Sequence, residues 1–173
     1  MAVGRLPPGE GSARGDDVGP NPTDRAKNGS KVSVLTEADG GPVSAFVAAA
    51  NVNDHLILQD VLEAVVVEPP KEVEQHLCLD KGYDNASSEA TAQVFSYEPH
   101  IRRIGEEKLD EKGKKKHPAR RWVVERTFAW LCRWRGILVR YEKKSRNYLA
   151  AIQLACALLW FRRLHRLQDG QAA

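Results

Sequence analysis

The sequence has little of what marks a secreted or membrane-bound protein. Only three of its 173 residues are cysteines, and they are scattered without a CxxC or CxxH pair. This argues against both a disulfide framework and a zinc site. The most apolar stretch, residues 150–161, is interrupted by Gln153 and is shorter than the ~18 residues of a membrane span. The amino terminus also lacks the basic start and apolar run of a secretory signal. These absences predict a cytoplasmic protein with no membrane partner.

Length and composition are those of one folded domain. Hydrophobic residues make up 42% of the chain and charged residues 28%, which excludes wholesale disorder and fibrous repeats. The net charge of +3 is unevenly distributed, because residues 102–146 carry 16 Lys and Arg against 6 Asp and Glu. This local balance of +10 indicates a protein that binds a phosphate backbone. A solvated, charged loop explains the same charge equally well.

The first part of the chain predicts an irregular segment followed by a hairpin. Pro and Gly recur throughout residues 1–28, which resists regular structure. Two β-prone runs, residues 31–37 and 42–48, flank an Asp-Gly turn and predict a hairpin. Apolar residues at helical spacing predict a helix over residues 55–67, which the two prolines at 69 and 70 end.

The second part alternates strands and helices. We expect a strand over residues 76–80, a helix over 86–95 and a short strand over 100–104. A polar loop over 105–117 comes next. Residues 121–135 gather apolar side chains on one arc of a helix, and 148–164, capped by Ser145 or Asn147, predict a largely buried last helix. This order is typical of an α/β protein.

Two carboxylates have positions suited to chemistry. Asp80 ends an apolar strand, where ligand groups in open α/β sheets gather. Glu125 lies at the margin of an apolar helical arc. Each has a plainer explanation that the residues alone favour: Asp80 could fix the Gly82 turn, and Glu125 could pair with Arg121 one turn earlier.

Five segments occur in an order that resembles bacterial DDE-type insertion-sequence transposases. They are residues 19–25 (GPNPTDR), 50–54 (ANVND), 79–84 (LDKGYD), 121–130 (RWVVERTFAW) and 147–150 (NYLA). The resemblance covers about residues 19–165 and implies a ribonuclease-H-like fold. Such proteins use two Asp and one Glu to hold divalent metal while DNA phosphodiesters are cut and joined.

The resemblance implies that Asp80 is the second Asp and Glu125 the Glu, both catalytic and metal-binding, with Mg²⁺ or Mn²⁺ as the ion. Mg²⁺ prefers such oxygen ligands. Arg121 matches an Arg four positions before the Glu. Pro118 and Cys132 stand where some relatives have Tyr and Lys, so no role that needs those side chains transfers.

The first Asp of the family has no evident counterpart. It lies on a strand before residues 19–25, and no β-prone run ending in Asp occurs in residues 1–18. Asp16 and Asp17 occupy a Gly-rich stretch. We therefore expect a ribonuclease-H-like α/β domain that is incomplete at its amino-terminal strand, with an irregular segment over 1–28, the partial domain over 29–168 and a tail over 169–173.

The basic residues supply candidate DNA contacts. Trp122 could stack on a base, although packing is the favoured role. The leading hypothesis is a truncated, inactive transposase fragment, which leaves enzymatic activity uncertain. The alternatives are a noncatalytic DNA-binding or inhibitory protein that pairs with an intact transposase or with itself, and a remnant without function. The predicted phosphate-binding residues are Lys114, Lys115, Lys116, Arg120, Arg121, Arg126 and Arg133, with Arg135 and Arg140 nearby.

Overall fold

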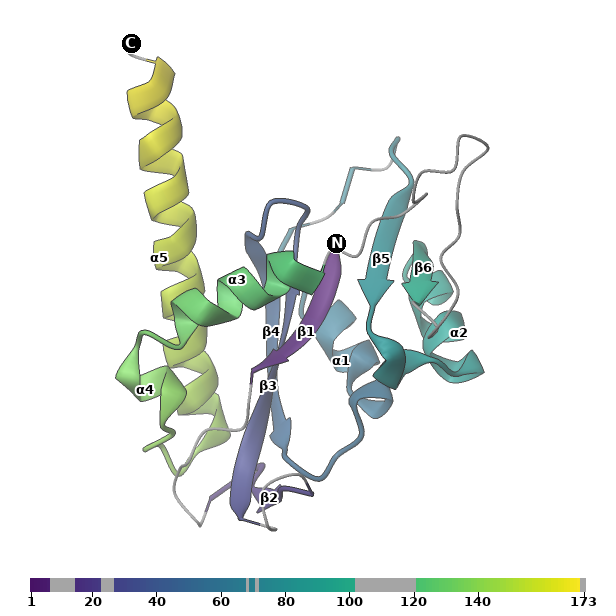
Figure 1. Cartoon of the computed structure of the whole chain (residues 1–173), viewed down its shortest axis with the longest axis vertical. Coiled ribbons are helices and arrows are strands. Elements are labelled where there is room, and N and C mark those ends of the chain that lie inside the picture. The colour runs from purple at the N-terminus through teal and green to yellow at the C-terminus, as the bar shows by residue number, and fades with distance from the viewer. Residues whose placement is uncertain (7–14, 23–26, 68, 71, 102–120, 172–173) are drawn as a thin grey trace.

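A computed structural model describes residues 1–6, 15–22, 27–67, 69–70, 72–101 and 121–171 of the chain, with helices on both faces of one mixed sheet (Figure 1). The predicted α/β class is confirmed. The predicted loop over 105–117 lies outside these residues.

The sheet is built around its first strand. The strands are β1 (Ala2–Leu6), β3 (Asn28–Thr36), β4 (Pro42–Ala49), β5 (Gln75–Leu79) and β6 (Tyr97–Ile101), in the spatial order β4-β3-β1-β5-β6. The first three along the chain pair antiparallel, while β5 is parallel to β1 and β6 is parallel to β5. A two-residue strand, β2 (Gly19–Pro20), pairs with the beginning of β3.

The predicted hairpin of β3 and β4 is confirmed, and its turn explains the chain reversal. Gly40 has φ of 90°, a conformation that disfavours residues with a Cβ. The Glu37 carboxylate accepts hydrogen bonds from the backbone N–H groups of Asp39 and Gly41, both at 2.7 Å. The Glu37 carboxylate and the glycines of the turn therefore together fix its conformation.

Alternation along the strands divides the core into two clusters. Val34 and Val47 face one side of the sheet, whereas Leu35 and Leu77 face the other. All four are at least 95% buried. This two-residue period is that of a sheet covered on both faces.

The second of these faces is covered by the first helices. They are η1 (Asp54–Leu56), α1 (Leu58–Glu63), η2 (Lys81–Tyr83) and α2 (Ala86–Val94). The predicted strand before residue 80 and helix after Asn85 are confirmed. Asn85 caps α2 by accepting a hydrogen bond from the Ser88 N–H at 2.8 Å. The predicted helix over 55–67 is shorter and begins with a 3₁₀ turn.

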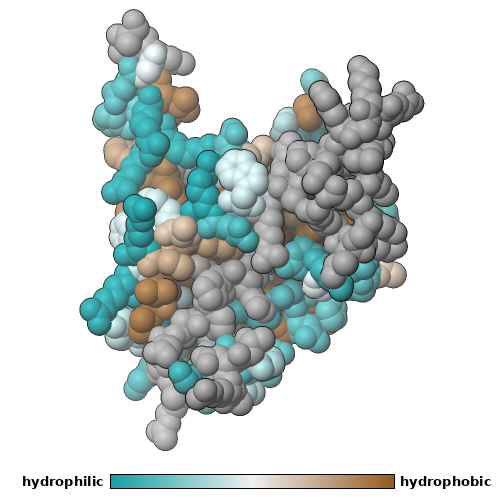
Figure 2. Space-filling model, viewed as in Figure 1, coloured by the Kyte–Doolittle hydropathy of each residue, from teal (hydrophilic) through white to brown (hydrophobic). Residues whose placement is uncertain are grey.

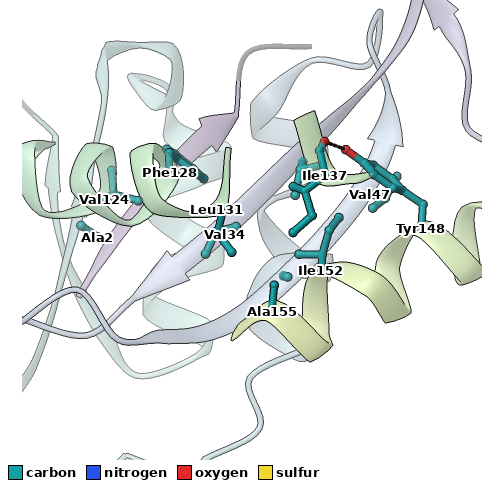
Figure 3. Packing of buried hydrophobic residues seen from close by; sticks show 12 residues of the cluster. Ala2, Val34, Val47, Val124, Phe128, Leu131, Ile137, Tyr148, Ile152 and Ala155 are labelled. Atoms are coloured by element: carbon teal, nitrogen blue, oxygen red, sulfur yellow. Dashed lines mark hydrogen bonds between the residues drawn. The ribbon is translucent and has the colours of Figure 1, made fainter. Parts of the chain in front are cut away.

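The other face is covered by α3 (Arg121–Leu131), α4 (Arg135–Leu138) and α5 (Ser145–Gln171). Figure 3 shows Val124 and Phe128 of α3 near Ala2 of β1, and Leu131 of α3 near Val34 of β3; with Ile152 and Ala155 of α5 they form one cluster over the sheet. The Tyr148 hydroxyl donates to the Ile137 carbonyl at 2.6 Å and joins α4 to α5. The predicted helix over 121–135 ends at Leu131, earlier than expected.

Two sequence predictions are wrong. The strand thought to be absent is present, since β1 lies inside the segment expected to be irregular and fills the slot between β3 and β5. Strands β3 and β5 supply the backbone hydrogen bonds of β1, a short strand that two prolines follow and that could not form such bonds alone. The last helix is also less buried than predicted. It begins at Ser145 and runs past the body of the sheet, leaving Phe161 64% exposed and Leu167 65% exposed (Figure 1).

Candidate active site at the carboxyl edge of the sheet

Asp80 directly follows β5, so its side chain leaves the sheet at the carboxyl edge of the parallel strands. The residue is exposed. One of its oxygens, Oδ1, accepts a hydrogen bond from the Gly82 N–H at 2.6 Å and caps η2. The plainer prediction, that Asp80 fixes the Gly82 turn, is therefore confirmed. Because that bond uses only one carboxylate oxygen, a ligand role for the other remains compatible with the geometry.

A second carboxylate, Asp54, lies close to this turn. Its Oδ2 is 3.9 Å from where a Cβ on Gly82 would stand, and Asp80 Oδ1 is 3.0 Å from the same point. These two oxygens are thus no more than about 7 Å apart. Segments 50–54 and 79–84 are two of the five segments that resemble transposases, and they meet at this edge of the sheet.

Lys31 of β3 holds Asp54 in place. Its ammonium group donates to Asp54 Oδ1 at 2.7 Å and to the Val52 carbonyl. The lysine side chain is only 4% exposed, whereas that of Asp54 is 23% exposed. A lysine is rarely buried unless it is paired, so this ion pair is a fixed part of the edge. Sequence reasoning missed it, although a lysine directly before the β-prone run Val-Ser-Val-Leu was a visible signal.

Strand β2 lies close to Asn51 of segment 50–54. A Cβ at Gly19 would stand 2.0 Å from Asn51 Oδ1, so β2 approaches the Asn51 side chain more closely than any other residue type permits. This contact gives Asn51 a structural role that its sequence position did not reveal.

Glu125 lies on α3, whose contacts set the direction of its side chain. Thr127 Oγ1 donates to the Gly40 carbonyl at 2.7 Å and Arg126 donates to the Asp39 carbonyl at 2.6 Å, so this side of α3 faces the β3–β4 turn. That turn lies at the amino edge of β1, because β3 is antiparallel to β1. At ~100° per residue, Glu125 emerges on the opposite side of the helix. It is exposed.

No carboxylate accompanies these residues on β1. The parallel register pairs Ala2 with Cys78, and continuing it places Gly4 level with Asp80. A Cβ at Gly4 would stand 2.6 Å from Val124 Cγ1, so α3 packs directly on this backbone. Strand β1 contains neither Asp nor Glu. Among the residues that the structure describes, no group of three His, Cys, Asp or Glu side chains is arranged to hold a metal ion.

The basic residues have divided roles. Arg133 is exposed on the segment after α3. Arg126 is also exposed, but it donates to Asp39 and lies over the Trp122 ring at 4.9 Å. Trp122 is 58% exposed, so its packing is limited to a partly buried ring under the Arg126 side chain. Of the other predicted DNA contacts, Arg121 begins α3, and Lys114, Lys115, Lys116 and Arg120 lie outside the described ranges.

Arg140, expected near the phosphates, is instead structural. It is 3% exposed and donates to the Asp16, Glu142 and Lys143 carbonyls at 2.8, 2.9 and 3.2 Å. These bonds tie the segment containing Asp16 to the chain that leads into α5. The candidate ligands Asp16 and Asp17 are thereby anchored beside Arg140, at the end of the sheet where β2 lies (Figure 1).

The fold and site together define an α/β protein with acidic side chains at the carboxyl edge of its sheet and a helix bearing arginines that packs on β1. Comparison with known proteins gives the family. The profile of the family described as "Transposase DDE domain" matches residues 8–160. The chain is also 35% identical over 160 residues, 88% of its length and 72% of the relative's, to a Burkholderia cepacia protein named "Putative transposase for insertion sequence element IS402".

The chain therefore belongs to the DDE transposase family, whose members act on DNA in transposition and generally use divalent metal ions. No solved structure matched it. Within the described ranges, no helix has the length and apolarity needed to cross a membrane.

Proposed function

We propose that this chain is a ribonuclease-H-like DNA transposase domain in which Asp80 and Glu125 are two of the metal-binding carboxylates, and that its catalytic site is incomplete. The strand order supports the fold assignment. Strand β1 is in the centre of the sheet, the antiparallel strands β3 and β4 lie on one side of it, and the parallel strands β5 and β6 lie on the other. The observation that supports the proposal most directly is that Asp80 directly follows the parallel strand β5, while Glu125 is an exposed residue of α3, the helix that packs on β1.

Asp80 and Glu125 are chemically suited to bind a divalent cation, but they are two carboxylates where three would be needed. Asp80 and Glu125 offer carboxylate oxygens, the ligands that Mg²⁺ and Mn²⁺ prefer. When bound in pairs, such ions activate the attacking oxygen and stabilise the leaving one. In this chain Asp80 and Glu125 would hold and orient the ion, and the Gly82 N–H would keep the Asp80 carboxylate in place.

The absence of acid on β1 supports low activity for the chain as it stands. A ligand at Gly4 would collide with Val124, so α3 would have to move to admit one. With two carboxylates instead of three, the repulsion between closely spaced cations is less well neutralised, and metal occupancy falls. The chain would then act by binding DNA, or by pairing with an intact transposase, rather than by cutting.

A cleavage assay tests this proposal. DNA carrying the ends of the element is incubated with the chain and Mg²⁺ or Mn²⁺, and nicked product is measured. We expect no cleavage by the chain, and metal-dependent cleavage by a chimaera whose first strand and preceding residues come from the IS402 relative. Asp80→Ala and Glu125→Ala in the chimaera should abolish that activity. Cleavage by the unmodified chain that is lost in both variants would show that its site is complete, with Asp16, Asp17 and Asp24 the first candidates for the third ligand.

DNA binding is measured separately by fluorescence anisotropy. We expect weak, sequence-independent association that declines steeply with salt, because the basic segment 102–146 acts through counterion release. Replacing Lys114, Lys115 and Lys116 with Ala should reduce both the affinity and the salt slope. An unchanged slope would remove these lysines from the interface.

A further inference from the structure

The outer face of α5 carries apolar side chains at a regular spacing. Ala150, Leu154, Ala157, Phe161 and Leu164 follow one another at intervals of four, three, four and three residues. We call these five residues the α5 seam. Leu154 is 61% exposed, Phe161 64% and Leu164 56%, and both alanines are exposed. Such alternation of threes and fours places side chains on one stripe that matches a second helix.

The opposite face of α5 is already occupied by its own domain. Ile152 and Ala155 are fully buried against the sheet. Farther along, the Trp160 Nε1–H donates to the Pro42 carbonyl at 2.7 Å, and Arg163 pairs with Glu37 at 2.7 Å. The helix is therefore held rigidly, with the α5 seam turned outward. Figure 2 shows hydrophobic side chains among hydrophilic ones on the projecting part of α5.

We infer that the α5 seam binds the α5 seam of a second copy of this chain in an antiparallel helix pair. The seam has two alternating positions, one held by Leu154 and Phe161 and the other by Ala157 and Leu164. In an antiparallel pair, a residue at one position faces a residue at the other position of the second helix. Phe161 then lies opposite Ala157 of the second copy, and Leu154 opposite Leu164 of the second copy. In these layers a large side chain meets a small one or two leucines meet, as close packing requires, and the same register sets Ala150 opposite Gln168 of the second copy.

A parallel pair fits less well. It would set Phe161 against Phe161 of the second copy and Ala157 against Ala157, which crowds one layer and leaves a void in the next. The seam itself therefore distinguishes the two orientations. The helix dipoles also oppose each other favourably in the antiparallel pair.

Charge is consistent with self-association, because the α5 seam contains no ionisable side chain. The arginines of this helix are directed elsewhere. Arg163 is paired with Glu37, and the Arg162 guanidinium lies over the Trp130 ring at 5.4 Å. Two copies can thus meet without opposing these two positive charges. Because each α5 is already folded on its sheet, association does not have to order the helix.

Sedimentation velocity and equilibrium of the full chain test the inference. We expect a concentration-dependent dimer. Leu154→Glu and Phe161→Glu should each raise its dissociation constant by about 100-fold or more, since each change removes an apolar contact from both copies. The control is Val94→Glu on α2, which replaces another exposed apolar residue, 79% exposed, and should leave the dimer intact. Circular dichroism verifies that the variants retain their helices.

Cross-linking tests the orientation. Chains carrying Leu154→Cys and Leu164→Cys are oxidised separately and as a mixture, with the native cysteines contributing equally to all three samples. The antiparallel pair predicts a covalent dimer that forms at least about tenfold faster in the mixture than in either chain alone. A chain that stays monomeric, a dimer that the seam variants leave unchanged, or faster cross-linking within each single sample would overturn the proposal.

Discussion

Removing Asp54 should destabilise the protein more than removing its partner Lys31. The two side chains form one ion pair at 2.7 Å, but their surroundings differ. The lysine is 4% exposed and the aspartate 23%. After Asp54→Ala, the Lys31 ammonium keeps only the Val52 carbonyl in a buried site. Leaving a buried charge without its partner costs roughly 3–5 kcal/mol.

Lys31→Met should cost less. The Asp54 carboxylate that remains can turn to water, so the change loses a charged hydrogen bond worth about 1.5–3 kcal/mol. The methionine also fills much of the apolar space that the lysine stem occupied. The double variant leaves no unpaired charge at all. Its cost should therefore be smaller than the two single costs together, by about 1–3 kcal/mol.

Urea unfolding followed by circular dichroism measures all three variants. Glu98→Ala, an exposed carboxylate on β6, serves as the control and should change stability by less than about 0.5 kcal/mol. If Lys31→Met costs as much as Asp54→Ala, or if the two effects simply add, then the pair is not the buried, asymmetric contact described above. Lys31 and Asp54 would then not secure the edge beside Asp80.

Three further outcomes follow from single contacts. Gly4→Ala should lower the free energy of unfolding by about 1–3 kcal/mol, because its Cβ would stand 2.6 Å from Val124; an unchanged thermal midpoint would mean that α3 does not pack on β1 at this point. Burial alone would raise the pKa of the Glu37 carboxyl, but the N–H groups of its turn and Arg163 hold that pKa below its usual value of 4.5. The wild type should therefore be more stable than Glu37→Gln above pH 4.5, with the gap closing as acid protonates Glu37; a gap independent of pH would contradict this. Burial raises the pKa of the Cys156 thiol to about 11, so iodoacetamide at pH 8 should alkylate it far more slowly than a free thiol, as mass spectrometry can show; a rate like that of free cysteine would refute the burial.

Local pattern was sufficient for most elements of this protein. The hairpin, the strand before Asp80 and the helix after Asn85 were predicted because alternation, turn residues and a cap act over a few neighbouring positions. Motif order was sufficient to indicate the family. Spacing predicted that Asp80 ends a strand and that Glu125 lies on a helix, and the resemblance to transposases, not spacing, singled out these two residues as candidate ligands.

Other features depended on residues that are distant in the chain. β1 exists because β3 and β5 offer hydrogen bonds on both sides, although its own sequence shows little strand pattern. The pairing of Lys31 with Asp54, and their approach to the Asp80 turn, joins segments that only the sheet brings to one edge. An all-round apolar helix predicted burial of α5, yet the sheet is too short to cover it, so its outer stripe remains exposed. Composition determined how apolar that helix is, and only tertiary packing decided which of its faces the domain buries.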